Sequence, residues 1–138
     1  CPDTLGVIGG GYQLVKFNSP ASIRRGDVYL PSVNWLVVQP SGAAASRQFM
    51  FRHEASGTTY TCESSPAPQY YNVASWTRGQ EVFFDSCSMR FAADAPTGHY
   101  SVSIALKDAD GNALPATDAA GQPVTENGVI VGEVTVSD

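Results

Sequence analysis

Five residues of this chain have side chains suited to acid–base catalysis, namely His53, Glu54, Asp85, Asp94 and His99. Such catalysis needs two groups held within hydrogen-bond reach, with pKa values shifted from their usual range. These residues fall at strand ends and in turns, without the spacing of a catalytic triad, a metal-ligand pair or a phosphate-binding loop. His53 alternates with Phe51 and Phe49, which favours a place in the core or at its rim. The sequence therefore predicts a protein that is not an enzyme.

The segment DADGNALPATD resembles a calcium loop, because Asp108, Asp110 and Asn112 alternate in it. An EF-hand loop has Gly at its sixth position and Glu at its twelfth, and here Ala113 and Ala119 stand there. A hairpin turn built on Asp-Gly-Asn explains the stretch more simply. We therefore predict no metal and no cofactor, with a structural calcium ion in this loop as the alternative.

Two of the three cysteines, Cys62 and Cys87, are predicted to form a disulfide. Neither belongs to a Cys-x-x-Cys pair, and the chain has only two histidines, so metal ligation is the weaker interpretation. The bond would close a loop of about two dozen residues and contribute on the order of 3 kcal/mol. Disulfides persist in oxidising compartments, which predicts an extracytoplasmic location, in the periplasm or at the cell surface.

Cys1 is then left without a partner, and the Gly-rich segment GVIGGG follows it closely. A Cys in this position is typical of a bacterial lipoprotein after its precursor has been cut. Several acyl chains on one residue give a stable anchor where one chain is marginal. We predict that residues 1–11 form a flexible tether with a lipid anchor at Cys1. The alternative is a free thiol at a chain boundary.

The segment PAPQYYNVASW is the main candidate for a binding surface. In an extended chain the neighbouring rings of Tyr70 and Tyr71 point to opposite sides, so one of them faces outward. Exposed aromatic rings beside amide side chains suit stacking on sugars or docking of a protein. We predict a partner- or glycan-binding site at Tyr70, Tyr71 and Asn72. The alternative is a long loop whose tyrosines cover one end of the domain.

The overall composition narrows the classes of partner. The chain has 138 residues, a net charge of −5 and eight Lys and Arg, with no basic cluster. Nucleic acid is therefore excluded as a predicted partner. No apolar run approaches the roughly 18 residues that a membrane-spanning helix needs.

The elements that must position these residues are β-strands. Segments rich in β-branched and aromatic residues alternate with turn sequences, at 12–18, 27–38, 47–53, 81–91, 99–108 and 128–136. From Tyr100 to Leu106 every second residue is apolar, and the residues between are Ser or Ala. Pro31 predicts a bulge or an edge within its segment. Together these patterns predict an all-β chain, a single immunoglobulin- or fibronectin-III-like sandwich of about 7–9 antiparallel strands over residues 12–138.

Three motifs lie in a recognisable order. A first strand ends at Trp35, a Trp-x-x-Gly segment follows, and a Pro-x-Gly-x-Tyr segment leads into a strand and an Asp-Gly turn. The residues of the second and third motifs are Trp76, Gly79, Glu81, Asp85, Pro96, Gly98 and Tyr100, with Gln80 inserted. Over about residues 22–136 the chain resembles a bacterial β-sandwich module found at the extracytoplasmic end of membrane glycosyltransferases and in other envelope proteins. Two departures are the missing glycosyltransferase membrane portion and the cysteine pair, which is not part of the pattern.

The resemblance carries expectations about core and function. Trp35, Trp76 and Tyr100 are predicted core residues, with the Tyr100 hydroxyl bonded to backbone near the Pro-Gly corner. We predict a non-catalytic accessory or structural subunit of a membrane-associated envelope assembly. Its partners would be other envelope or membrane proteins, and the membrane itself through the lipidated N-terminus. A carbohydrate-binding module that uses exposed aromatic residues is the alternative.

Overall fold

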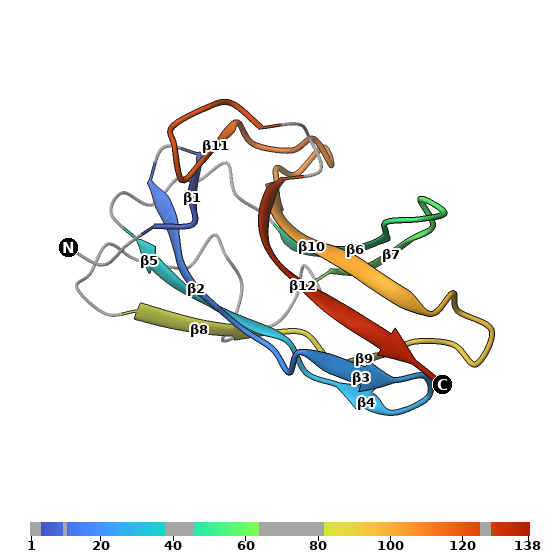
Figure 1. Cartoon of the computed structure of the whole chain (residues 1–138). Coiled ribbons are helices and arrows are strands. Elements are labelled where there is room, and N and C mark those ends of the chain that lie inside the picture. The colour runs from blue at the N-terminus through green and yellow to red at the C-terminus, as the bar shows by residue number, and fades with distance from the viewer. Residues whose placement is uncertain (1–3, 10, 38–45, 64–81, 125–127) are drawn as a thin grey trace.

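The computed structural model describes residues 4–9, 11–37, 46–63, 82–124 and 128–138, which contain twelve β-strands and no helix (Figure 1). The strands are β1 (Gly6–Ile8), β2 (Tyr12–Asn18), β3 (Ser22–Arg24), β4 (Val28–Tyr29), β5 (Ser32–Val37), β6 (Ser46–His53), β7 (Thr59–Glu63), β8 (Val82–Ser86), β9 (Met89–Arg90), β10 (Gly98–Lys107), β11 (Ala116–Asp118) and β12 (Val129–Ser137). The all-β class predicted from the sequence is confirmed.

The strands form two five-stranded sheets and one short strand pair. Sheet A has the order β11-β1-β2-β5-β8, sheet B has the order β3-β12-β10-β6-β7, and β4 pairs with β9. Figure 1 shows the two sheets facing each other across the core. Among the described strands the pairing is antiparallel except for β3, which runs parallel to β12. The prediction of an antiparallel sandwich is thus right apart from this edge strand.

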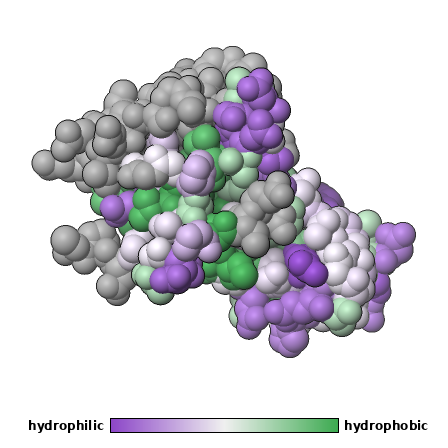
Figure 2. Space-filling view, turned by 90° about the horizontal axis from the view of Figure 1, so that it is seen from above, coloured by the Kyte–Doolittle hydropathy of each residue, from purple (hydrophilic) through white to green (hydrophobic). Residues whose placement is uncertain are grey.

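Side chains that point inward at every second position of the central strands form the core. On β10 the side chains from Tyr100 to Leu106 that point inward have no exposed surface. Phe49 and Phe51 of β6 are buried beside them, and Trp35 of β5 packs from sheet A with no exposed surface. Burial of large side chains from both sheets is the main favourable term that holds a sandwich together. Figure 2 shows the molecule from above, from the side on which β11 lies in Figure 1. Apolar residues lie near the middle of this view, and polar residues lie farther out.

The N-terminal tether predicted over residues 1–11 is wrong for the part that the structure describes. Gly6–Ile8 form β1, which pairs with both β2 and β11. Ile8 has no exposed surface, and Leu5 packs partly against the core. The glycines in this segment are the basis for predicting a tether. The segment instead pairs with two strands as part of sheet A. The sheet therefore begins well before residue 12.

Two long predicted strands are each divided between sheets. Pro31 lies between β4 and β5, so one predicted segment contributes first to the short strand pair and then to sheet A. The segment 81–91 is divided in the same way into β8 and β9, at Cys87 and Ser88. A proline cannot donate to a ladder, which explains the first break.

A tight corner leads into β10. Gly98 has a φ of +123°, which favours glycine, and it follows Pro96 closely. The Tyr100 hydroxyl donates to the Pro96 carbonyl at 2.6 Å, while its ring lies in the core. This contact fixes the start of the central strand of sheet B.

Candidate functional site

The outer face of sheet B carries two rows of side chains that cross its strands. Each row places a serine of β10 between one residue of β6 and one of β12, and the rows are Met50–Ser103–Ile130 and Arg52–Ser101–Glu133. Cross-strand neighbours on one face lie about 4.5–5.5 Å apart, so ligand groups can contact several of them at once.

A β-bulge in β12 decides which of its residues reach this face. The register between β10 and β12 shifts between Val102 and Ser103, so that Gly132 pairs with Val102 and Ile130 pairs with Ser103. Val131 is the extra residue. Ile130 consequently lies on the outer face, where it is 69% exposed.

Residues 118–124 and Gly128 provide a second wall. Asp118 ends β11 in sheet A, and its Oδ1 accepts hydrogen bonds from the N–H groups of Ala120 at 2.9 Å and Gln122 at 3.0 Å. At the other end Gly128 lies against β10, where an added Cβ would come within 2.0 Å of the Ile104 carbonyl oxygen. Its φ of +97° also favours glycine, so this close approach depends on it.

These two walls enclose a groove of about 410 Å³. Its polar lining residues are Arg52, Ser101, Ser103 and Asp118. Its apolar side chains belong to Met50, Pro123, Val124 and Ile130. A concave site of this size, with a few polar groups among apolar ones, has the general character of a ligand-binding site.

Three of the polar side chains in the groove are available to a ligand. Arg52, Ser101 and Ser103 have no side-chain hydrogen bond or ion pair within the part of the chain that the structure describes. Ser103 is only 7% exposed, yet no fully buried polar atom among the described residues lacks a partner. Its hydroxyl therefore retains contact with the groove. A hydroxyl that reaches the groove in this way can donate or accept a hydrogen bond to a ligand there.

The ring of His53, the first of the catalytic candidates, is hydrogen-bonded on both nitrogens to neighbouring parts of the chain. Its Nδ1 lies 2.7 Å from Ser56 Oγ and accepts the Ser56 backbone N–H at 3.1 Å, so Nε2 carries the proton and donates to the Thr97 carbonyl at 2.8 Å. Ser56 Oγ also accepts the Thr58 N–H and lies 2.9 Å from Thr58 Oγ1. This serine–histidine contact ties the β6–β7 turn to the corner before β10.

Among the described residues, none of the other catalytic candidates forms a side-chain hydrogen bond with His53, although the Glu54 N–H donates to the His99 carbonyl at 3.0 Å. Glu54, Asp94 and His99 are exposed, and the Asp85 side chain lies outside the described residues. The His99 Nδ1 lies 3.1 Å from Thr135 Oγ1 on the neighbouring strand.

The segment for which a calcium loop was the alternative forms a turn. Asp108 Oδ1 accepts the N–H groups of Asp110 and Asn112, each at 2.9 Å, and Gly111 has a φ of +86°. The same side-chain cap recurs at Asp118 in the next turn. Within the described ranges, no three His, Cys, Asp or Glu residues are grouped so as to hold a metal ion.

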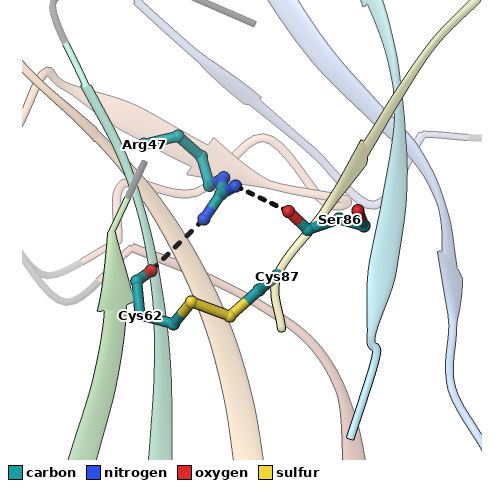
Figure 3. The surroundings of a disulfide bond; sticks show 4 residues. All are labelled: Arg47, Cys62, Ser86 and Cys87. Atoms are coloured by element: carbon teal, nitrogen blue, oxygen red, sulfur yellow. Dashed lines mark hydrogen bonds between the residues drawn. A yellow bond between two sulfur atoms is a disulfide. The ribbon is translucent and has the colours of Figure 1, made fainter. Parts of the chain in front are cut away.

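The predicted disulfide joins Cys62 of β7 to Cys87, the residue after β8 (Figure 3). Since β7 and β8 are edge strands of different sheets, the bond closes one side of the sandwich. Arg47, which is 3% exposed, bridges the same edges, donating to the Cys62 carbonyl at 3.2 Å and the Ser86 carbonyl at 3.0 Å. Its guanidinium carbon lies 4.5 Å from the centre of the Phe49 ring. The disulfide and Arg47 together hold the edge strands of the two sheets to each other.

Several predicted residues fall outside the described part of the chain, namely Cys1, Tyr70, Tyr71, Asn72 and Trp76. Their predicted roles as anchor, binding site and core residue stay predictions.

Sequence reasoning missed the groove residues Arg52, Ser101, Ser103 and Asp118. The alternation in β10 did indicate that Ser101 and Ser103 share a face. Arg52, on a different strand, could not be assigned to that face without the register of β6 against β10.

Comparisons with known proteins support the fold. No protein-family model matches the chain, and no curated protein matches its sequence. The crystal structure of the C-terminal domain of Wzt is similar, with a TM-score of 0.59 and 16% identity, covering 100% of this chain and 80% of that one. The CARDB domain of the PF1109 protein from Pyrococcus furiosus, solved with di-metal ions, gives a TM-score of 0.42 and 10% identity, covering 94% and 92%. The chain thus has the architecture of a β-sandwich module, as the resemblance in its motifs predicted, although neither neighbour is described as a glycosyltransferase.

Proposed function

We propose that this chain is a non-catalytic binding module whose ligand lies in the groove on the outer face of sheet B. One observation carries the proposal: Arg52, Ser101 and Ser103 reach the groove without partners of their own. By contrast, the polar side chains of His53 and Asp108 are engaged in a corner and in a turn. A β-sandwich fold is compatible with a binding or accessory role.

The ligand that fits this groove is a glycan. A sugar ring has a rim of hydroxyl groups and faces of C–H groups. The serine hydroxyls can donate and accept hydrogen bonds to such a rim, and the guanidinium and Asp118 add a donor and an acceptor. Met50, Val124 and Ile130 provide apolar surface for the C–H faces.

The setting of the module is outside the cytoplasm. The Cys62–Cys87 disulfide suggests an oxidising compartment. Within the described residues, no helix has the length and apolar character needed to cross a membrane. In this proposal the module is an accessory subunit of a membrane-associated envelope assembly, held to the membrane by lipid on Cys1. The mass of the N-terminal peptide from native protein tests the anchor: acyl chains on Cys1 would support it, and an unmodified Cys1 would overturn it.

A groove-blocking substitution tests the site itself. Ser101→Tyr places a ring over the groove floor, whereas Ser22→Tyr places the same ring on the exposed edge strand β3. Affinity electrophoresis in gels that contain neutral or acidic bacterial polysaccharides should retard the wild type and Ser22→Tyr, and not Ser101→Tyr. Equal retardation of all three proteins, or no retardation in any gel, would reject the groove as a glycan site.

Binding through Tyr70, Tyr71 and Asn72 is the competing location. If a Tyr70→Ala, Tyr71→Ala double variant loses polysaccharide binding while Ser101→Tyr keeps it, the ligand lies on that segment and not in the groove.

A further inference from the structure

The charge in the groove points to a more specific ligand. We infer that the groove binds an acidic glycan, a uronic-acid polymer, with a sugar carboxylate on the Arg52 guanidinium. This inference rests on the proposed function, since it names the class of ligand for the same groove.

Arg52 differs from the other arginines that the structure describes. Arg24, Arg25, Arg47 and Arg90 each donate to a backbone carbonyl. Arg25 also forms an ion pair with Asp138. Arg52 has no partner in the described chain, and its exposed side chain lines the groove. A long cationic side chain with this freedom is available for a ligand anion.

The neighbours of Arg52 favour a carboxylate that is attached to a hydroxylated ring. Arg52 is paired with Ser101 on β10 and with Thr59 on β7. A planar guanidinium can hold both oxygens of a carboxylate in parallel hydrogen bonds. Hydroxyl groups on the same sugar would then lie over Ser101 and Ser103.

Two acidic residues also lie at or near the groove. Asp118 lines the groove, and Glu133 lies across Ser101 from Arg52. A ligand carboxylate near these residues would be repelled, whereas sugar hydroxyls can donate to them. The charges therefore orient the ligand, with its carboxylate toward β6 and its neutral hydroxyls toward β12. A sugar ring with a single carboxylate can place that carboxylate on Arg52 and its hydroxyl groups near the acidic residues.

The experiment compares one polymer in two charge states. Oligomers of polygalacturonic acid, and the same oligomers with their carboxyl groups reduced to primary alcohols, are titrated by calorimetry. The wild type should bind the acidic form more tightly by about 10- to 100-fold, which is the range for hydrogen bonds to charged groups. Arg52→Gln should remove this preference, and Arg52→Lys should keep part of it. Arg90→Gln, which changes an exposed arginine on β9, should behave as wild type.

The outcomes separate this inference from the proposed function. If both forms bind equally and Arg52→Gln has no effect, while Ser101→Tyr still prevents binding, the groove is a glycan site but the carboxylate inference is wrong. If neither form binds and an acidic peptide does so in an Arg52-dependent way, the glycan inference is overturned in favour of a peptide ligand. Unfolding curves of each variant, matched to wild type, ensure that a loss of binding reflects the side chain.

Discussion

Arg47 and Arg52 lie on the same strand and have opposite roles because they point to opposite faces. Arg47 is buried on the inner side of β6, and its guanidinium satisfies the carbonyls of Cys62 and Ser86. Arg52 is exposed on the outer side. A buried charge that is hydrogen-bonded within the chain stabilises the fold, whereas an exposed charge without a partner is available for binding.

Replacing Arg47 tests its structural role. Arg47→Met keeps much of the side-chain length but removes the donors of two part-buried hydrogen bonds, to the Cys62 and Ser86 carbonyls, so we expect a loss of about 2–4 kcal/mol in the free energy of unfolding. Urea denaturation gives this value. Arg90→Met, at an exposed position, should change it by less than about 0.5 kcal/mol. Similar values for the two variants would contradict the structural role.

Two buried tyrosines predict a loss of stability at alkaline pH. Burial raises the pKa of Tyr29, with a smaller opposing effect of its hydrogen bond to Ser19. Burial also raises the pKa of Tyr100, aided by nearby Tyr60 and opposed by Arg25. A tyrosine whose pKa is raised in the folded state contributes stability that is complete below about pH 10, its unfolded value, and is lost as the pH rises through the folded pKa.

Urea denaturation between pH 8 and pH 11 checks this prediction. Near pH 8 the two tyrosines should not make the unfolding free energy of the wild type depend on pH. Above about pH 10 this free energy should fall. Tyr100→Phe should be less stable at pH 8, by about 1 kcal/mol, since the Pro96 carbonyl loses its donor. Its decline at high pH should be shallower than that of the wild type. An identical decline would mean that Tyr100 ionises equally well in both states.

At the scale of elements, the disulfide fastens the edge strands of the two sheets. Its cysteines are separated by 25 residues, so the chain-entropy model gives a contribution of about 3 kcal/mol. A Cys62→Ala, Cys87→Ala variant should lose that amount, as measured by urea denaturation. Adding a reductant should destabilise the wild type to a similar extent and leave the double variant unchanged. A variant as stable as the oxidised wild type would show that Arg47 and the core hold these edges without the bond.

Replacing each of two glycines by alanine distinguishes the cost of a positive φ from the cost of a steric clash. Gly111 and Gly128 have φ values of +86° and +97°, but an added Cβ meets nothing within 4 Å at Gly111 and lies 2.0 Å from Ile104 O at Gly128. Gly111→Ala should therefore cost about 1 kcal/mol. Gly128→Ala should cost clearly more, because the wall of the groove must move off β10. Thermal unfolding of the two variants measures the difference, and equal costs would contradict the close packing of Gly128.

The sequence predicted long alternating strands well, because each of them carries its own periodicity. The segments that became β2, β6, β10 and β12 are nearly correct in their bounds. The short strands β1, β3 and β11 were missed, since three residues are too few for a period and since the partners of β3 and β11 lie far away in the chain. The groove was missed for the same reason. It depends on register between strands and on the bulge at Val131, which single-strand patterns do not contain.

At the scale of the whole molecule, distant parts of the chain meet at the sheet edges. β3 lies parallel to β12, with Ile23 paired to Val136, and β1 is paired with β11. By contrast, β6 and β7 form a local hairpin in which Arg52 pairs with Thr59. A fold with many distant pairings must close large loops before those contacts become favourable. We therefore expect refolding on the scale of milliseconds to seconds, as in other all-β sandwiches.

The order of these events can be tested with one buried side chain from each kind of pairing. Ile23 packs partly against the core at the parallel edge, and Phe51 of β6 has no exposed surface. If the parallel edge forms last, Ile23→Ala should raise the unfolding rate and leave the refolding rate nearly unchanged, because its contacts are absent from the transition state. Phe51→Leu should slow refolding. Stopped-flow fluorescence of the tryptophans, which include the fully buried Trp35, follows both rates. A slower refolding of Ile23→Ala would instead mean that the two ends of the chain meet before the central strands are consolidated, and the sandwich would then assemble from its edge inward.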